Sequence, residues 1–225
     1  MLTDTDFHVD DDIRRAETLP AAAFTDRAFL DRELATIFRT SWLVVPERSD
    51  DPRPLDEQVS ARGSRVPITV LDRPLFVQRG WDDDTLRCFP NTCTHAWFPL
   101  VIGASRGPTL VCGQHGRRFD CTGKFVSQPG FQGAPGFPRD CDHLTSLPVA
   151  PWRRMMFANL DPAARSFTES WAEIDASLAQ MPTPEDRLPS QEVREIAGNW
   201  KQHAWNYLDR FHIGYVHRPP GGRCT

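Results

Sequence analysis

The chain has 225 residues, of which 40% are hydrophobic and 25% charged, as in an ordinary globular protein. Its 26 basic and 30 acidic residues leave a net charge of −4, which gives no reason to expect nucleic acid or an anionic membrane as a partner. No apolar run approaches the roughly 20 residues that span a bilayer, and the N-terminus lacks the pattern of a secretory signal. We therefore expect a cytoplasmic protein whose six cysteines are not a disulfide framework.

The first 45 residues divide into an acidic tail and a helix that leads into a strand. Because the tail crowds like charges together, we expect it to be disordered. The stretch 25–45 starts with a Thr-Asp cap, spaces its apolar residues at helical intervals and predicts a strand from Trp42 to Val45. The acidic residues are Asp4, Asp6, Asp10, Asp11 and Asp12, and the apolar helix positions are Phe29, Leu30, Leu34, Ile37 and Phe38.

Residues 60–160 have the texture of an antiparallel β domain. Short β-rich runs are separated by glycine and proline, and their spacing predicts a small barrel or sandwich. A Pro/Gly-rich loop is expected at 127–140. The clearest runs are VPITVLD, LFVQRG, TLRCF, TLVC and MMFANLD.

Helical patterns return in the last third of the chain. FTESWAEIDASLAQM predicts a helix over 167–181, SQEVREIAG predicts a strand over 190–198, and NWKQHAWNYLDRFHIGYVH predicts a helix over 199–217. The sequence contains no internal repeat. The overall fold class expected is therefore α+β and rich in β-structure.

Two Cys/His pairs form the first candidate site: Cys93-x-His95 and, sixteen residues later, Cys112-x2-His115. Each pair follows a β run, so two hairpin tips can hold a metal centre between them. Zinc accepts a tetrahedral Cys₂His₂ set, although zinc fingers usually pair Cys with Cys and His with His. One Cys and one His per loop instead favours a Rieske-type [2Fe–2S] cluster, with both cysteines on one iron and both histidines on the other.

The second candidate site is Asp209-x2-His212-x4-His217. On an ideal helix Asp209 and His212 share a face, whereas the five-residue step leaves His217 about 140° away from His212. Both imidazoles reach one ion only if the helix loosens or ends early, which Gly214 would permit. Histidines near a helix end are also common as surface or capping residues, and Asp209 can equally be an ordinary surface carboxylate.

These motifs resemble the large (α) subunits of Rieske-type non-haem iron (aromatic-ring-hydroxylating) oxygenases. CTH and CGQHGRRFDCTGKF are similar to the family's two cluster loops, and NWK…NYLDRFHIGYVH is similar to the segment that supplies two ligands of a mononuclear Fe(II). Ala96 departs from the family, which often has Arg after the first His. The resemblance covers nearly the whole chain, but only about the first half of a typical α subunit.

The resemblance implies a role for each candidate residue. Cys93, His95, Cys112 and His115 would hold the cluster, and His212 and His217 would bind the iron. Asp209 would bridge the two centres by hydrogen bonding to an iron-ligating His and, across a subunit boundary, to His115. Asn206 and Tyr207 would shape the iron pocket.

The implied activity is mono- or dioxygenation of an organic substrate with O₂, and aromatic compounds are among the substrates that the resemblance implies. A ferredoxin or a flavin/NAD(P)H reductase would donate the electrons, and the assembly would be a homotrimer. The implied domains are an acidic tail and helix (1–39), a Rieske domain (40–155) and the first part of a helix-grip, SRPBCC-like catalytic domain (156–225).

The expected third iron ligand is missing from the sequence. Non-haem Fe(II) sites that activate O₂ typically use two His and one carboxylate, yet no Asp or Glu follows Asp209. We expect a truncated or fragmentary catalytic domain, with an exposed apolar face on the 199–217 helix and weak binding of mononuclear iron. A stand-alone Rieske electron carrier and a zinc-stabilised binding module are the alternative functions.

Other residues near the motifs have simpler expected roles. Trp97, Phe98 and Phe119 are expected to pack around the cluster. A basic neighbourhood could steer an acidic electron donor or be a solvated surface: Arg106, Arg117, Arg118 and Lys124. The remaining thiols (Cys88, Cys121, Cys141 and Cys224) are expected to be buried or incidental, and His8, His143 and His203 are not expected to be ligands.

Overall fold

The computed structural model describes residues 10–46, 50–51, 53–179 and 195–217, which fall into two compact units. Residues 36–191 form one unit, and residues 1–35 join 192–225 in the other. This division groups the N-terminal helices with the last helices, which the sequence did not predict. The described part of the chain contains no helix that is both long and apolar enough to span a bilayer.

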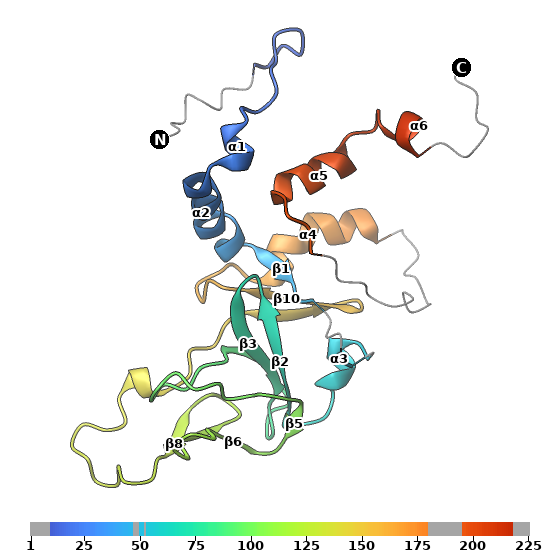
Figure 1. Cartoon of the computed structure of the whole chain (residues 1–225). Helices are drawn as coiled ribbons and strands as arrows, with labels where there is room; N and C mark the ends of the chain where they lie inside the picture. The colour runs from blue at the N-terminus through green and yellow to red at the C-terminus, as the bar shows by residue number, and fades with distance from the viewer. Residues whose placement is uncertain (1–9, 47–49, 52, 180–194, 218–225) are drawn as a thin grey trace. The chain divides into compact units, whose positions relative to one another are not determined.

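Three small antiparallel sheets make up the body of the 36–191 unit (Figure 1). The largest has the strand order β4-β3-β2-β5, and the others have the orders β6-β7-β8 and β1-β10-β9. The antiparallel β-rich fold expected from the sequence is confirmed. The strands are β1 Trp42–Val44, β2 Ser64–Val70, β3 Arg73–Arg79, β4 Leu86–Pro90, β5 Ser105–Arg106, β6 Thr109–Val111, β7 Arg118–Asp120, β8 Phe125–Ser127, β9 Val149–Trp152 and β10 Met155–Asn159.

Three short helical segments precede or connect the strands: η2 Phe38–Thr40, α3 Leu55–Gln58 and η3 Asp140–Asp142. The predicted loop at 127–140 does connect β8 to η3. Strand β9 was missed because its sequence contains Pro151. A proline is tolerated there because β9 is an edge strand of its sheet.

Strand β3 is buried on both faces and separates two hydrophobic cores. Leu75 and Val77 face a core of aliphatic side chains, while Phe76, between them, packs against Phe89 in the second core with ring centroids 5.4 Å apart. The second core also contains Cys93 and Cys112. The cysteines of the candidate site are therefore part of a packed interior.

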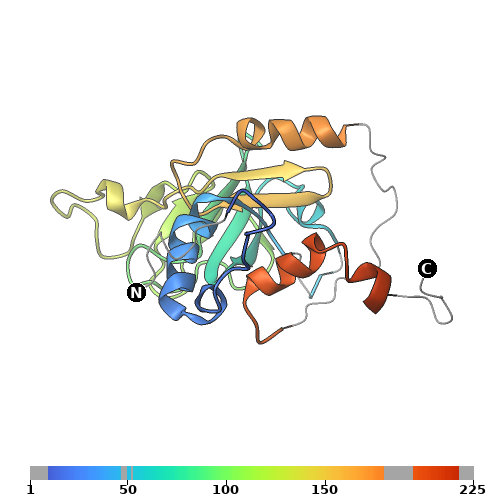
Figure 2. The same ribbon diagram turned by 90° about the horizontal axis from the view of Figure 1, so that it is seen from above.

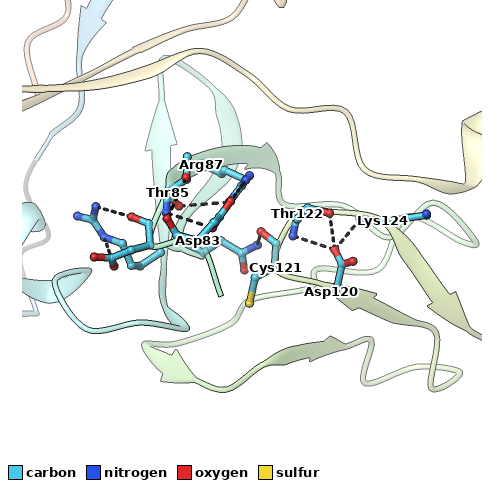
Figure 3. Close-up of polar contacts among 10 residues, drawn as sticks. Asp83, Thr85, Arg87, Asp120, Cys121, Thr122 and Lys124 are labelled. Carbon is cyan, nitrogen blue, oxygen red and sulfur yellow. Dashed lines mark hydrogen bonds and ion pairs between the residues drawn. The ribbon is translucent and has the colours of Figure 1, made fainter. Parts of the chain in front are cut away.

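Aspartates organise two hairpin turns of this unit (Figure 3). Asp120 accepts hydrogen bonds from the backbone N–H groups of Thr122 (2.8 Å) and Lys124 (3.1 Å) in the β7–β8 turn. In the β3–β4 turn, Asp83 forms an ion pair with Arg87 and accepts from the N–H of Thr85. These carboxylates satisfy turn N–H groups that have no partner in the β ladder.

Helix α4 (Phe167–Leu178) lies along the β9–β10 hairpin (Figure 2). Ser166 and Glu169 form a capping box at its start, and the predicted helix at 167–181 is thereby confirmed over this range. Aromatic rings join the two elements, with Trp171 4.8 Å from Phe157. The predicted strand at 190–198 lies largely outside the described residues, and residues 195–198 are not a strand.

The other unit contains the helices α1 Ala22–Thr25, α2 Arg27–Thr36, α5 Trp200–Leu208 and α6 Ile213–Val216. The Asp26 carboxylate caps α2 by accepting from the N–H of Ala28 at 2.8 Å, so the predicted helix start is confirmed. Buried Glu33 of α2 accepts hydrogen bonds from the Lys201 Nζ (2.6 Å) and the Trp200 Nε1 (3.2 Å) of α5. This ion pair joins two helices that lie far apart in the sequence.

Part of the acidic tail is ordered in this unit. Asp10 and Asp12 pair with Arg15 and Arg14 in a turn, so the predicted disorder does not extend over these two residues. Residues 1–9 lie outside the described part of the chain.

We predict that Gly123→Ala destabilises the fold by about 3 kcal/mol. Gly123 has φ +84°, and an added Cβ would lie 2.6 Å from the buried Phe89 ring, so backbone strain adds to overpacking. Chemical denaturation followed by circular dichroism measures the change. Gly103→Ala is the matched control because its Cβ would meet no atom within 4 Å; equal effects of the two variants would contradict the packing argument.

Candidate metal centres

The first cluster loop follows β4 and is closed by the side chain of Asn91. This buried amide accepts hydrogen bonds from the backbone N–H groups of Leu100 (2.9 Å) and Val101 (2.8 Å) and donates to the carbonyl of Val101 (2.7 Å). Sequence reasoning did not single out Asn91. Asn91 directly follows strand β4 and lies two residues before Cys93. An asparagine at such a position often closes a loop with its side chain, so the sequence did contain a signal for this role.

The two loops close with the same backbone pattern. The N–H of Cys93 donates to the carbonyl of Phe98 and that of Cys112 to the carbonyl of Arg117, both at 2.8 Å and both five residues ahead. In each loop, the N–H of the fourth residue after the Cys donates back to the carbonyl of that Cys. The two loops are thus structural counterparts despite different Cys-to-His spacings.

The fourth residue has positive φ in both loops, +70° at Gly116 and +54° at Trp97. Glycine adopts this conformation without strain, whereas tryptophan does so at a cost. The Trp97 side chain is 83% exposed, so the expectation that it packs around the cluster is wrong. Phe119 is fully buried and Phe98 packs against the same core, as expected.

Burial separates the sulfur atoms from the imidazoles. Cys93 and Cys112 are 1% and 2% exposed, whereas His95 and His115 are exposed at the surface with their rings 4.7 Å apart. The structure therefore brings the four predicted residues together as a buried thiol pair and an exposed imidazole pair.

The protonation states of the site are set by this burial. Burial raises the pKa of the Cys93 thiol, and the adjacent Cys112 side chain adds to the rise, while the N–H groups of His95 and Ala96 oppose it. Partial desolvation of the ring, followed by the nearby His115 and Arg117, lowers the pKa of His95 and so favours its neutral form. A neutral imidazole is the form that ligates a metal, and a bound cation is what would favour the thiolates.

A buried polar network surrounds the two loops. Arg117 is only 3% exposed in its side chain and donates to the Gln128 Oε1 (2.5 Å), the Thr94 Oγ1 (2.7 Å) and the Asp142 Oδ1 (3.1 Å). Gln128 in turn lies 3.2 Å from His95, measured from Nε2 to Nδ1. The expectation that Arg117 belongs to a basic surface is therefore wrong, while Arg106, Arg118 and Lys124 are exposed.

The other cysteines and histidines of this unit are not part of the two Cys/His pairs. Burial raises the pKa of the Cys88 thiol to about 12, and Cys121 is also buried, whereas Cys141 is exposed. His143 accepts a hydrogen bond from the N–H of Phe125 through Nδ1. Cys224 and His8 lie outside the described residues.

The donor set fits a binuclear cluster. Each iron of a Rieske cluster takes two protein ligands, and the structure supplies one Cys pair and one His pair. Tetrahedral zinc would need four ligands around one point, and no three His, Cys, Asp or Glu side chains of the described residues converge in that way.

The second candidate site lies in the unit of residues 1–35 and 192–225, where the helix geometry differs from the prediction. Helix α5 ends at Leu208, and Asp209 is its C-cap with extended backbone (φ −78°, ψ 110°). His212 and His217 flank the single turn α6. The continuous helix predicted for 199–217 is therefore wrong, and the break lies before His212 rather than between the two histidines.

This break brings the predicted residues close to one another. The His212 and His217 rings have centroids 5.3 Å apart, and the Asp209 Oδ2 lies 3.5 Å from the His212 Nδ1. The His212 Nδ1 is buried without a hydrogen bond in the described structure, as an unused donor atom of a metal ligand would be. Two imidazoles and a neighbouring carboxylate thus fit a metal site that still lacks a third ligand.

The surface around these residues is apolar and exposed, as expected for this segment. Leu208 is 81% and Phe211 87% exposed, and Tyr207 is 75% exposed. Asp209 also lines a hollow of about 910 Å³ whose other walls include Phe24, Trp200 and Trp205. His203 stacks edge-on against Tyr207 with centroids 5.0 Å apart and takes no part in the pair of histidines.

A comparison with known protein families matches the part of the chain that contains the first site. The family model described as the Rieske [2Fe-2S] domain matches residues 54–138, a range that includes both loops and all four paired residues. This part of the chain is therefore similar to Rieske [2Fe–2S] domains. The cofactor of such a domain is a [2Fe–2S] cluster, as the sequence predicted. The predicted domain limits of 40–155 remain a prediction.

Several known proteins are similar to the chain over most of its length. The chain is 24% identical over 207 residues to the carnitine monooxygenase oxygenase subunit of Escherichia coli K12, covering 91% of this chain and 53% of that protein. It is 29% identical over 204 residues to the 2-halobenzoate 1,2-dioxygenase large subunit of Burkholderia cepacia, covering 86% and 42%. The predicted resemblance to Rieske oxygenase large subunits is thus confirmed as a similarity over nearly the whole of this chain.

Solved structures show the same fold. The quaternary ammonium Rieske monooxygenase CntA matches with a TM-score of 0.76 at 22% identity, covering 90% of this chain and 55% of that one. Naphthalene 1,2-dioxygenase matches with a TM-score of 0.66 at 25% identity, covering 86% and 43%. The chain spans about half the length of the relatives it matches.

We predict that Asn91→Ala lowers the free energy of unfolding by about 3 kcal/mol, because two N–H groups and one carbonyl in the first cluster loop lose their buried partner. Equilibrium denaturation of the intact chain measures the loss. Thr92→Ala, at the next position, should change stability by less than about 0.5 kcal/mol. Equal effects would mean that Asn91 does not hold the loop.

Proposed function

We propose that this chain serves as the electron-accepting portion of a Rieske oxygenase large subunit, which oxygenates an organic substrate with O₂. The cluster is held by Cys93 and Cys112 on one iron and by His95 and His115 on the other. The observation that supports this assignment most directly is the pairing of buried thiols and exposed imidazoles on two loops of matching closure.

We further assign a mononuclear Fe(II) site to His212 and His217. The short His–His distance and the unpartnered Nδ1 of His212 support this assignment. When bound, the cluster carries single electrons and the mononuclear iron activates O₂. The Asp209 carboxylate lies 3.5 Å from the His212 Nδ1 without a hydrogen bond to it, and we assign this carboxylate the role of the bridge between the two metal centres.

The proposed partners follow from the same assignment. A ferredoxin or a flavin/NAD(P)H reductase supplies electrons at the exposed imidazole pair, and a small organic molecule is the substrate. One related structure, of a quaternary ammonium Rieske monooxygenase, is described as revealing inter-subunit electron transfer. A homotrimer in which Asp209 meets His115 of a neighbouring subunit is the arrangement that we propose here.

A stand-alone electron carrier is the second candidate. All four predicted cluster ligands lie in the 36–191 unit, together with both hydrophobic cores. This unit therefore supplies every cluster ligand without the other unit, as a stand-alone carrier requires. Oxygen consumption separates the candidates: an oxygenase consumes O₂ in proportion to substrate when donor is supplied, whereas a carrier only becomes reduced and reoxidised.

We predict that the purified chain, reconstituted anaerobically, holds two irons and two acid-labile sulfides, as the cluster requires. Cys112→Ser should lose most of both, because a thiolate ligand is removed. Cys141→Ser, which changes an exposed thiol outside the site, should keep both. Iron and sulfide analysis with electron paramagnetic resonance of the reduced protein provides the measurement. A wild-type chain without labile sulfide would refute the assignment.

We predict that Fe(II) binds weakly at the second site of this chain, because the described residues provide two imidazoles but no converging third ligand. Anaerobic equilibrium dialysis should show iron beyond the cluster that a chelator removes easily. His212→Ala together with His217→Ala should weaken this binding by more than about tenfold, while His203→Ala leaves it unchanged. Tight, stoichiometric iron that survives the double substitution would place the site elsewhere.

A further inference from the structure

Arg117 is a buried cation two residues after His115, and it pairs with the buried carboxylate of Asp142. The guanidinium lies between the Phe125 and Phe137 rings, 5.3 and 5.6 Å from their centroids. A buried ion pair is usually no more stabilising than apolar side chains of the same volume, because both charges lose their hydration. Stability alone therefore gives little reason for an ion pair at this position.

We propose that Arg117 is a positioning residue for the cluster, joining the two ligand loops and raising the cluster's reduction potential through its buried charge. This inference rests on the cluster assignment under the proposed function and assigns a role to a residue that is not itself a ligand.

The first step is the mechanical link between the loops. Thr94 lies between the two ligands of the first loop, and its Oγ1 accepts from the Arg117 Nη1 at 2.7 Å and donates to the Asp142 carbonyl at 3.0 Å. Arg117 directly follows Gly116 in the second loop. A single guanidinium thus connects both loops with η3, where Asp142 lies.

The second step fixes the orientation of His95. Arginine can only donate, so the Gln128 Oε1 must be the acceptor of the Arg117 Nε. The amide NH₂ of Gln128 then faces the His95 Nδ1, which must accept and therefore carries its lone pair there. Arg117 in this way orients the Gln128 amide and, through it, the imidazole ring of His95.

The third step is electrostatic. Reduction adds one negative charge to the cluster, and a buried cation beside it stabilises the reduced form more than a solvated one would. The charges that face Arg117 are those of Asp142, 3.1 Å away, and of the more distant Arg139, whose Nε is 3.7 Å from the other Asp142 oxygen. The two members of the ion pair should therefore have opposite effects on the potential.

The test is a redox titration of the intact, reconstituted chain at fixed pH, followed by circular dichroism of the cluster. Arg117→Met should lower the potential, so that the ratio of reduced to oxidised cluster at a given ambient potential falls roughly tenfold. Asp142→Asn should raise the same ratio. Arg117→Lys, which keeps the charge but loses the fork of donors, should stay nearer to the wild type than Arg117→Met.

Arg118→Met is the matched control, since this exposed neighbour on β7 should change the ratio by less than about twofold. Equal potentials in all variants, or shifts of the same sign from Arg117→Met and Asp142→Asn, would overturn the proposal and leave Arg117 a structural residue. If Arg117→Met does not retain a cluster, the potentials of Arg117→Lys and Asp142→Asn provide the test. An unchanged or lowered potential in Asp142→Asn would then overturn the proposal. A wild-type chain that forms no cluster would instead refute the proposed function.

Discussion

The backbone hydrogen bond from each loop cysteine to the carbonyl five residues ahead is the constraint on which the candidate cluster site depends. It closes 93–98 and 112–117 into matching turns. The cysteine lies at the start of each turn, and its side chain packs in the core that contains Phe76 and Phe89. The imidazoles, further along each turn, remain at the surface. An electron carrier needs this combination of a protected inner side and an accessible outer side.

The loops match in closure but differ in the residues that accomplish it. Gly116 adopts positive φ freely, whereas Trp97 holds the same conformation with a large exposed indole next to His95. The second loop provides the buried guanidinium of Arg117, and the first loop provides the Thr94 hydroxyl that accepts its hydrogen bond. The network of Arg117, Thr94 and Asp142 therefore forms only when both loops are in place. Cluster geometry and local electrostatics are therefore coupled in this domain.

The second site depends on a different constraint, the end of α5. Since the helix stops at Leu208, the chain turns back through Asp209 and places His212 beside His217. The buried Glu33–Lys201 pair joins α2 to the start of α5, with Lys201 over the rings of Phe24 and Phe29. This pair gives the helix that leads into the histidines a fixed neighbour within its own unit.

The sequence by itself determined which residue types are available at both candidate sites. The order Cys-x-His and Cys-x2-His is specific, because thiolates and imidazoles in mixed pairs suit few metal centres. Strands such as β2, β3 and β10 also follow from local alternation and apolar runs. The helix end after Leu208 was not predicted, because the pattern of apolar residues continues through it.

Only the tertiary structure decided which side chains lie together inside the protein. Arg117 sits in a run of basic residues that looks like a solvated loop, and its acidic partner is 25 residues away in a separate turn. Asn91 and Gln128 are likewise polar residues that no sequence motif marks. Their roles as hydrogen-bond partners follow from their burial. Local sequence encodes residue type and backbone preference, whereas the removal of a charge from water depends on contacts between distant segments that form only on folding.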